Sequence, residues 1–184
     1  MFKFIKEKIR REFVKKLDYK FVYNVCKSYE RYVVNVVKDI PESQDFPVFE
    51  IPDVSIIIPV YNQYDLTMKC LYSLKTNTNI PYEIILVDDC STDKTKTIEQ
   101  RVKNITVIHN EENLGFLKNC NEGGKRAKGK FIWLLNNDTQ VLPGACDFLA
   151  ETLIKDEKNG CAGSKLIYPD GKLQSAGSSV IPGR

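Results

Sequence analysis

The sequence predicts an α/β fold with a mostly parallel sheet flanked by helices. Apolar stretches rich in β-branched residues begin near positions 54, 82, 105 and 130, and stretches with helical spacing separate them. Strands that alternate with helices favour a parallel sheet, because each helix returns the chain to the same end of the sheet. A chain of 184 residues is long enough for one such domain with its own core and one additional segment.

The N-terminal segment, residues 1–40, is basic and shows two stripes of apolar residues at helical spacing. Residues 1–20 alone carry eight Lys or Arg and three Asp or Glu. Three roles are open for this segment: packing on the α/β domain, an oligomer interface, or peripheral contact of residues 1–20 with an anionic membrane surface. No nucleic-acid partner is expected, because the basic stretch is short and no recognised binding module accompanies it.

Residues 41–52 contain three prolines and predict an extended linker, so the α/β domain is expected over residues 53–184. The expected elements of that domain are, in order, a strand in "VSIIIPVYN", a helix over 65–76, a strand in "YEIILVDDCSTD", a helix over 93–102, a strand in "ITVIHN", a helix in "GFLKNCNEGGKRAKG", a strand in "KFIWLLNND" and a helix over 143–155. The apolar run Phe131 to Leu135 predicts a strand buried on both faces. Asp170-Gly171 between two short apolar segments predicts a hairpin.

Composition excludes several classes of protein. The six cysteines form no CxxC pair and the chain has a single histidine, His109, so a zinc site is not expected and the histidine is interpreted as structural. Scattered cysteines indicate reduced thiols and a cytoplasmic protein, with the inner face of the membrane as the alternative if residues 1–20 bind lipid. No apolar run approaches the ~20 residues of a membrane span, and no signal peptide is recognised.

Three of the predicted strands end in polar clusters. These clusters are Pro59-Val60-Tyr61-Asn62, Asp88-Asp89-Cys90-Ser91-Thr92-Asp93 and Asn136-Asn137-Asp138. In a parallel sheet all three clusters reach the same edge, where ligands bind in open α/β folds.

Each cluster also has a purely structural interpretation. Ser91 or Asp93 is a suitable N-cap for the following helix, and Asn136-Asn137-Asp138 is a suitable turn. Neither interpretation explains the adjacent carboxylates Asp88 and Asp89. The functional interpretation is a diphosphate bridged by Mg²⁺ or Mn²⁺, since these ions prefer oxygen ligands and Mg²⁺ is usually held by one or two carboxylates together with substrate phosphates. A dinucleotide or P-loop site is disfavoured, because the turn after the first strand, "PVYNQYD", contains no glycine and no GxxxxGK[ST] loop occurs.

Five stretches together resemble family 2 glycosyltransferases of the GT-A fold, in particular a rhamnosyltransferase-like subgroup. They are "VSIIIPVYNQYDLTMKCLYSL", "YEIILVDDCSTDKT", "NLGFLKNCNEG", "KFIWLLNNDTQVLPG" and "GSKLIYPDGKLQSAG", which cover roughly residues 53–180 in the family's order. The part resembled is the donor-binding half, so the domain is expected to be incomplete at its C-terminus.

The resemblance implies an inverting, metal-assisted transfer of a sugar from a UDP- or dTDP-linked donor to a glycan or other hydroxyl acceptor, in bacterial surface polysaccharide synthesis. The residues that it implies for donor binding are Pro59, Tyr61, Asn62, Asp88, Asp89, Asn113, Gly115, Asn136 and Asn137. Asp89 is expected to face the base, Asn137 to lie near the ribose, and Asp138 to contact the Mg²⁺ or Mn²⁺ ion. Asn136 stands where the family's DxD motif has its first acid.

The catalytic general base of the family is expected beyond Arg184. The alternative function is therefore a non-catalytic nucleotide-sugar-binding or interaction module.

Overall fold

A parallel sheet of four strands lies at the centre of the fold, in a computed structural model that describes residues 39–176. The strands stand in the order β5 (Thr106–His109), β3 (Tyr82–Asp88), β2 (Val54–Val60) and β6 (Phe131–Leu134). Each neighbouring pair runs parallel, with Val54 opposite both Tyr82 and Phe131. The predicted α/β class with a mainly parallel sheet is confirmed.

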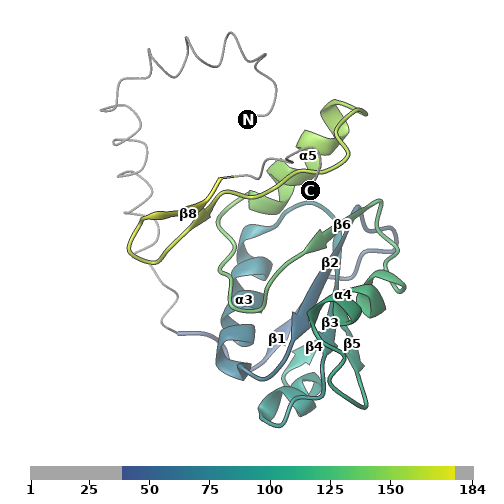
Figure 1. Ribbon diagram of the computed structural model, residues 1–184, viewed down its shortest axis with the longest axis vertical. Helices are drawn as coiled ribbons and strands as arrows, with labels where there is room; N and C mark the ends of the chain where they lie inside the picture. The colour runs from purple at the N-terminus through teal and green to yellow at the C-terminus, as the bar shows by residue number, and fades with distance from the viewer. Residues whose placement is uncertain (1–38, 177–184) are drawn as a thin grey trace, which may run out of the picture. The chain divides into compact units, whose positions relative to one another are not determined.

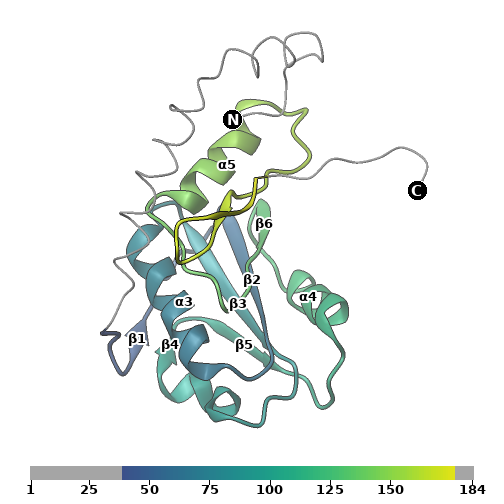
Figure 2. The same cartoon turned by 60° about the vertical axis from the view of Figure 1, so that its left-hand side comes forward.

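Helices cover both faces of this sheet, as the two ribbon views show together (Figures 1 and 2). On one face α3 (Tyr64–Asn77) and α5 (Ala145–Lys155) contribute to the larger hydrophobic core with side chains from β2 and β3. On the other face α4 (Phe116–Gly124) lies over β2 and β3. The two central strands are therefore buried on both faces, which explains their continuous apolar sequences.

Helix α4 lies unusually close to the sheet at Gly123. A Cβ added there would lie 2.5 Å from Ile57 Cγ2 and 3.0 Å from Val87 Cγ2. Ile57, Ile85 and Val87 form the small core cluster beneath the helix and are fully buried. Only glycine permits this approach without a shift of the side chains beneath it.

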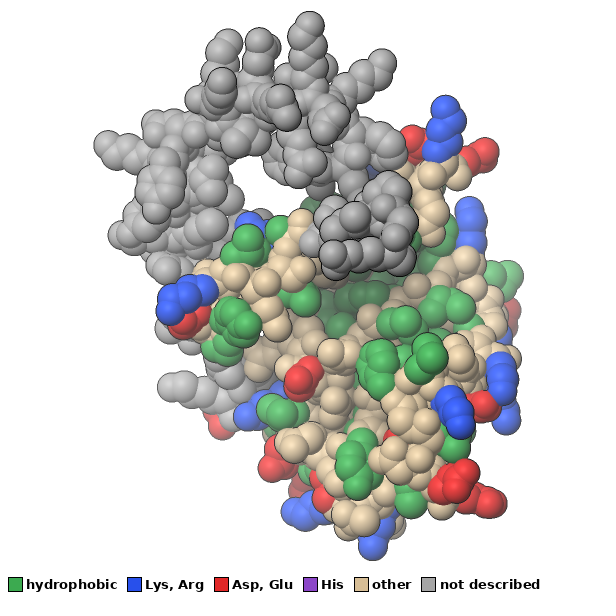
Figure 3. Space-filling view, viewed as in Figure 1, with side chains coloured by type: hydrophobic (Ala, Val, Ile, Leu, Met, Phe, Trp, Pro, Cys, Tyr) green, Lys and Arg blue, Asp and Glu red, His purple; other side chains and the backbone are tan. Residues whose placement is uncertain are grey.

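Strand β6 differs from the expectation of a strand buried on both faces. It lies at the end of the described sheet, and Ile132 and Leu134 are each 54% exposed. The prediction was wrong in the described structure because an apolar run does not show whether a strand is central or at an edge. Figure 3 shows hydrophobic side chains gathered around β6 on the visible face of the molecule.

The segment expected as a helix over 93–102 is a 3₁₀ helix, η1 (Lys94–Gln100), interrupted by non-helical backbone at Thr97. The chain then forms a short strand, β4 (Val102–Lys103). Part of the proline-containing stretch, β1 (Gln44–Asp45), pairs with β4 in parallel, and the Gln44 side chain donates a hydrogen bond to Met68 O at 3.0 Å.

The described residues fall into two compact units, one comprising residues 39–162 and the other residues 163–176. The second contains the antiparallel hairpin of β7 (Leu166–Ile167) and β8 (Leu173–Ser175), as predicted. No helix among residues 39–176 is long and apolar enough to cross a membrane. The predicted basic segment 1–40 lies almost wholly outside the described residues, and the division of the chain at 40 and 52 stays a prediction.

Candidate functional site

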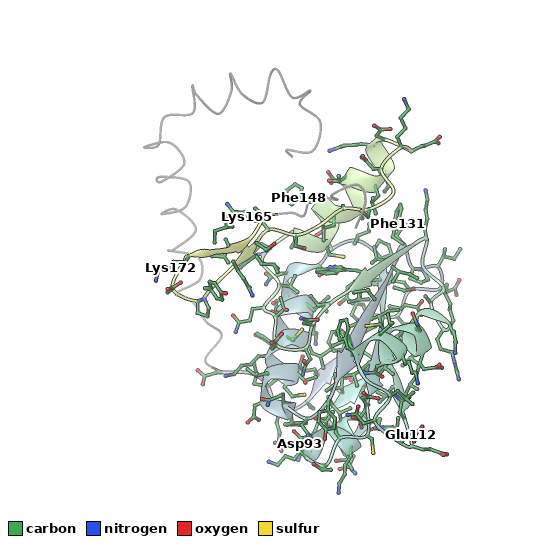
Figure 4. The ribbon with its side chains drawn as sticks, in the orientation of Figure 1. Asp93, Glu112, Phe131, Phe148, Lys165 and Lys172 are labelled. Atoms are coloured by element: carbon green, nitrogen blue, oxygen red, sulfur yellow. The ribbon has the colours of Figure 1, made fainter. Side chains whose placement is uncertain are left out.

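A pocket of about 340 Å³ opens at the carboxyl edge of the sheet, between the ends of β2, β3 and β6 and the N-terminus of α4. Figure 4 shows Asp93 and Glu112 at this end of the sheet and Phe131, the first residue of β6, at the opposite end. The residues that line the pocket are Pro59, Val60, Tyr61, Asp89, Asn113, Gly115, Phe116, Asn119, Asn136, Asn137 and Asp138. Eight of the ten predicted site residues are thus brought together, and the two others, Asn62 and Asp88, lie behind the pocket wall.

Asn62 holds the turn after β2 from behind. Its backbone is left-handed, with φ of 58°, a conformation that asparagine tolerates better than most residues. Its backbone N–H donates to Ser91 Oγ at 2.7 Å, and its side-chain oxygen accepts from the backbone N–H of Thr92 and of Asp93. The turn that presents Tyr61 to the pocket is therefore tied to the loop after β3.

Asp93 plays the capping role that the sequence left open. Its carboxylate accepts from the backbone N–H of Thr95 at 2.9 Å, at the start of η1, and from that of Tyr64 at 3.0 Å, at the start of α3. Burial raises the pKa of Asp93, but the hydrogen bonds from Thr95 and Tyr64 lower it by more, so that the pKa lies below its ordinary value. Ser91 is not a cap, since its hydroxyl accepts from Asn62 instead.

Asp88 is buried beside the site rather than in it. One carboxylate oxygen accepts from the backbone N–H of Ser91 at 3.0 Å, and the other lies 2.8 Å from His109 Nδ1. The second ring nitrogen of His109 lies 2.8 Å from Glu99 Oε1. Burial lowers the pKa of His109, but the hydrogen bonds to Glu99 and Asp88 raise it by more, and its pKa lies above the ordinary value.

Asp89 lines the pocket and is only 3% exposed. One of its oxygens accepts from Asn110 Nδ2 and from the backbone N–H of Leu114, both at 2.9 Å, and the other from the backbone N–H of Gly115 at 2.9 Å. Gly115, whose φ of 77° favours glycine, then begins α4. Asp89 thus fixes the loop that carries Asn113 as well as facing the pocket.

The cluster after β6 is held less tightly. Leu135 N–H still donates to Ile57 O, which continues the pairing with β2. Beyond it, the Cys70 thiol donates to Asn136 O at 3.6 Å, and Asn137 Nδ2 donates to Thr67 Oγ1 at 3.0 Å. Burial first, and the nearby Asp138 carboxylate second, raise the pKa of Cys70 to about 12, so the thiol stays protonated and able to donate.

Asp138 is exposed at the pocket, and its carboxylate accepts no hydrogen bond from the described residues. Among residues 39–176, no group of three or more His, Cys, Asp or Glu side chains is arranged to hold a metal ion. A single open carboxylate next to two amide side chains still suits Mg²⁺ or Mn²⁺, since such ions take substrate phosphates and water as their remaining ligands. The residues present therefore fit an ion that arrives with a diphosphate.

Sequence reasoning missed Phe116 and Asn119 in the pocket lining, and it placed Val60 at this edge of the sheet without assigning it to donor binding. Asn119 is 2% exposed, donates to Val87 O at 2.9 Å and accepts from Asn110 Nδ2 at 3.0 Å. It lies four residues after Gly115, on the same side of α4, and this helical spacing was the available signal. Phe116, by contrast, is 62% exposed in the first turn of the helix.

Comparison with known proteins supports the resemblance to family 2 glycosyltransferases over most of the chain. The family model described as "Glycosyl transferase family 2" matches residues 55–180. The "Uncharacterized glycosyltransferase" of Haemophilus influenzae is 32% identical over 100 residues, which are 54% of this chain and 34% of that protein. The "Putative teichuronic acid biosynthesis glycosyltransferase TuaG" of Bacillus subtilis is 36% identical over 91 residues, which are 47% of this chain and 36% of that protein.

A crystal structure of S. aureus TarS in complex with UDP-GlcNAc is also similar, with 27% sequence identity and a TM-score of 0.50. The match covers 57% of this chain and 32% of TarS. The matched region therefore spans about a third of the length of these three proteins.

Proposed function

The chain belongs to glycosyl transferase family 2, and from this we propose that its pocket binds the nucleotide-diphosphate sugar from which a glycosyltransferase moves the sugar to a hydroxyl group of a glycan. The observation that carries the proposal is the convergence of three strand ends and the start of α4 on one pocket. Nucleotide ligands bind at this edge in open α/β sheets. The proposed role in bacterial surface polysaccharide synthesis draws support from the name of TuaG.

We assign the nucleoside to the side of the pocket formed by β2 and β3. Asp89 retains a carboxylate oxygen with a single protein donor, which leaves acceptor capacity for an N–H of a pyrimidine base. Pro59 and Tyr61 supply apolar and aromatic surface beside it, and Tyr61 is 53% exposed. UDP-linked and dTDP-linked donors both present such a base, and the complex of TarS with UDP-GlcNAc makes UDP-GlcNAc the first donor to test.

We assign the diphosphate to the end of β6. Asp138 would hold a Mg²⁺ or Mn²⁺ ion, with Asn136 and Asn137 as neutral neighbours toward the ion and the ribose. When bound, the ion would offset the negative charge that develops on the departing nucleoside diphosphate. Because Asn136 adds no negative charge, ion binding is expected to depend on the nucleotide.

The proposed transfer is an inverting displacement. The acceptor oxygen forms a bond to the anomeric carbon while the bond from that carbon to the diphosphate oxygen breaks, and the hydroxyl proton passes to a general base. We assign that base to no residue of this chain. The pocket residues hold the donor and its leaving group.

Calorimetric titration of the full chain with UDP-GlcNAc, UDP, dTDP and NAD, each with and without Mn²⁺, tests the donor site. We expect binding of the pyrimidine nucleotides that strengthens with Mn²⁺, and weak or no binding of NAD. A preference for NAD, or nucleotide binding indifferent to Mn²⁺, contradicts the proposal.

Asp138→Asn tests the metal assignment, with Asp45→Asn as the matched control at an exposed carboxylate on β1. Asp138→Asn is expected to abolish the effect of Mn²⁺ on UDP affinity while leaving metal-free affinity nearly unchanged, and Asp45→Asn is expected to behave as the parent. An undiminished effect of Mn²⁺ in Asp138→Asn would remove Asp138 from the metal site.

A further inference from the structure

The two carboxylates at the end of β3 are each held by a side chain at the end of β5. Asp88 lies opposite His109 in the parallel register, and the two side chains are in contact. In the next residues along the chain, Asn110 Nδ2 donates a hydrogen bond to Asp89 Oδ1. The backbone adds a further link, from Asn110 N–H to Asp88 O at 2.9 Å. Two consecutive side chains of one strand therefore hold two consecutive carboxylates of its neighbour.

Each of these carboxylates supports a different wall of the pocket. Asp88 accepts from Ser91 N–H, and Ser91 Oγ accepts from Asn62 N–H, in the turn that presents Tyr61. Asp89 holds the opposite wall through the backbone N–H groups of Leu114 and Gly115. Neither His109 nor Asn110 lines the pocket. His109 reaches it through Asp88, and Asn110 reaches it through Asp89 and through its hydrogen bond to Asn119 Oδ1.

From this arrangement we propose that His109 and Asn110 are positioning residues of the nucleotide pocket, and that His109 performs this role as an imidazolium, so that nucleotide-sugar affinity falls when the ring loses its proton. The inference rests on the proposed donor site for its effect on binding. The effect on the two walls stands on the geometry alone.

The need for an imidazolium follows from the two contacts of the ring. Both ring nitrogens lie 2.8 Å from a carboxylate oxygen, at Asp88 and at Glu99. A neutral ring has one N–H, so one nitrogen would turn a lone pair toward a carboxylate, whereas the imidazolium donates to both. The raised pKa of His109 agrees with this.

The charged groups that contact His109 come from two elements, β3 and η1, and Lys103 on β4 acts on one of these groups. Asp88 on β3 is 2% exposed at its side chain, and Glu99 on η1 is 50% exposed. Lys103 Nζ donates to Glu99 O at 2.8 Å. Burial raises the pKa of the Glu99 carboxyl, but hydrogen bonds from its own backbone and from His109, with the charges of His109 and Lys103, lower it below its ordinary value. Whichever nitrogen keeps its proton, deprotonation removes the positive charge beside both carboxylates. The loss is expected to matter more at Asp88, because its buried side chain is less accessible to water and salt.

The first experiment follows the wall held by Asp88, by NMR and without any nucleotide. The chain has one histidine, so its ring signals report the titration of His109 without overlap. In the parent we expect the amide signals of Ser91 and Asn62 to shift with the same midpoint as the ring. In His109→Gln they should not shift, and in Glu99→Gln the midpoint should move to lower pH. Amide signals that ignore the ring titration would overturn the positioning role of His109.

The second experiment measures UDP-GlcNAc affinity at one pH below and one pH above the ring midpoint found by NMR. The diphosphate of a nucleotide sugar holds no proton that titrates in this range. We expect about three- to tenfold weaker binding at the higher pH in the parent and a ratio near one in His109→Gln. Cys90 is an exposed free thiol next to Asp89, so both measurements are repeated with Cys90→Ser as a control.

Asn110→Ala tests the other half of the pair, with Glu112→Ala as the control at an exposed position of the same loop (Figure 4). We expect the Leu114 and Gly115 amides to shift and affinity to fall about tenfold in Asn110→Ala only. Equal effects of the two variants would overturn the role of Asn110. Failure of the parent to bind UDP-GlcNAc, UDP or dTDP at either pH would overturn the proposed donor site and the pH effect on binding. The NMR titration would then decide the positioning role separately.

Discussion

The ends of β3 and β6 both carry aspartates, but these are buried and hydrogen-bonded at the end of β3 and exposed after β6. Asp88 and Asp89, at the end of β3, are 1% and 3% exposed, and both oxygens of each lie within hydrogen-bond distance of protein groups. Asp138 after β6 is exposed and receives no hydrogen bond from the described residues. Both regions border the same pocket. At the end of β3 the carboxylate oxygens are bonded to protein groups, whereas after β6 the Asp138 oxygens remain available to a ligand.

This difference indicates two roles: the buried carboxylates stabilise the pocket walls, and the exposed carboxylate is free to bind a ligand. A buried carboxylate is tolerated only where donors replace water, and once those donors are in place the carboxylate fixes their positions in turn. An exposed carboxylate stays hydrated and needs no protein donors, so its oxygens can coordinate a cation that binds later. We therefore expect changes after β3 to affect stability and changes after β6 to affect only ligand binding.

Asp89→Ala is expected to give the largest loss of stability. It leaves the backbone N–H groups of Leu114 and Gly115 and the Asn110 amide without their acceptor, and we expect the free energy of unfolding to fall by about 2–3 kcal/mol. Urea denaturation of the full chain near neutral pH measures it. A loss below about 0.5 kcal/mol would mean that Asp89, like Asp138, is available to a ligand and does not stabilise the fold.

Asp93→Ala should have the next largest effect. Its carboxylate joins the starts of η1 and α3 through Thr95 and Tyr64, so its removal costs one helix cap and one further bond. We expect a loss of about 1–2 kcal/mol, again by urea denaturation. Asp45→Ala is the control. Asp45 is exposed on β1, opposite Lys103 of β4, and its replacement should change the free energy of unfolding by less than about 0.5 kcal/mol.

Much of this contrast was accessible from sequence. The convergence of the clusters at Asn62, Asp89 and Asp138 followed from parallel strands alone, because their carboxyl ends must share one edge. The cap at Asp93 followed from residue type and position, with Ser91 as the equal alternative. Local patterns were sufficient wherever the answer depended on one element and its neighbours.

The network itself was not accessible from sequence. The bonds of His109 and Asn110 to the acidic pair depend on the register of β5 against β3, which strand patterns do not specify. Asn119 reaches the pocket because Gly123 lets α4 lie close to the sheet, a packing effect that helix periodicity alone does not reveal. The exposure of Ile132 likewise depends on the place of β6 in the sheet rather than on its own residues.

The pH dependence of stability gives a smaller test of the Asp93 contacts. The lowered pKa of Asp93 means that the folded state favours the carboxylate. Its contribution is therefore present above the unfolded pKa, near about 3.9, and is lost as pH falls through the lower folded value. We expect the stability difference between parent and Asp93→Asn to shrink as the pH falls below about 3.9, by less than the whole loss in Asp93→Ala. A difference that grows on acidification would reverse the sign of the pKa shift.

Asp138→Ala is expected to have the smallest effect on stability and is the sharpest test of the contrast. Its carboxylate faces water at the pocket and holds no described backbone group, so we expect the free energy of unfolding to change by less than about 0.5 kcal/mol. The nearby Cys70 thiol would lose a repulsive charge and its pKa would fall, with the thiol still protonated at neutral pH. Urea denaturation in the absence of metal gives the measurement. A loss comparable to that of Asp89→Ala would mean that the end of β6 is built like the end of β3, and that its carboxylate is part of the wall rather than a free ligand.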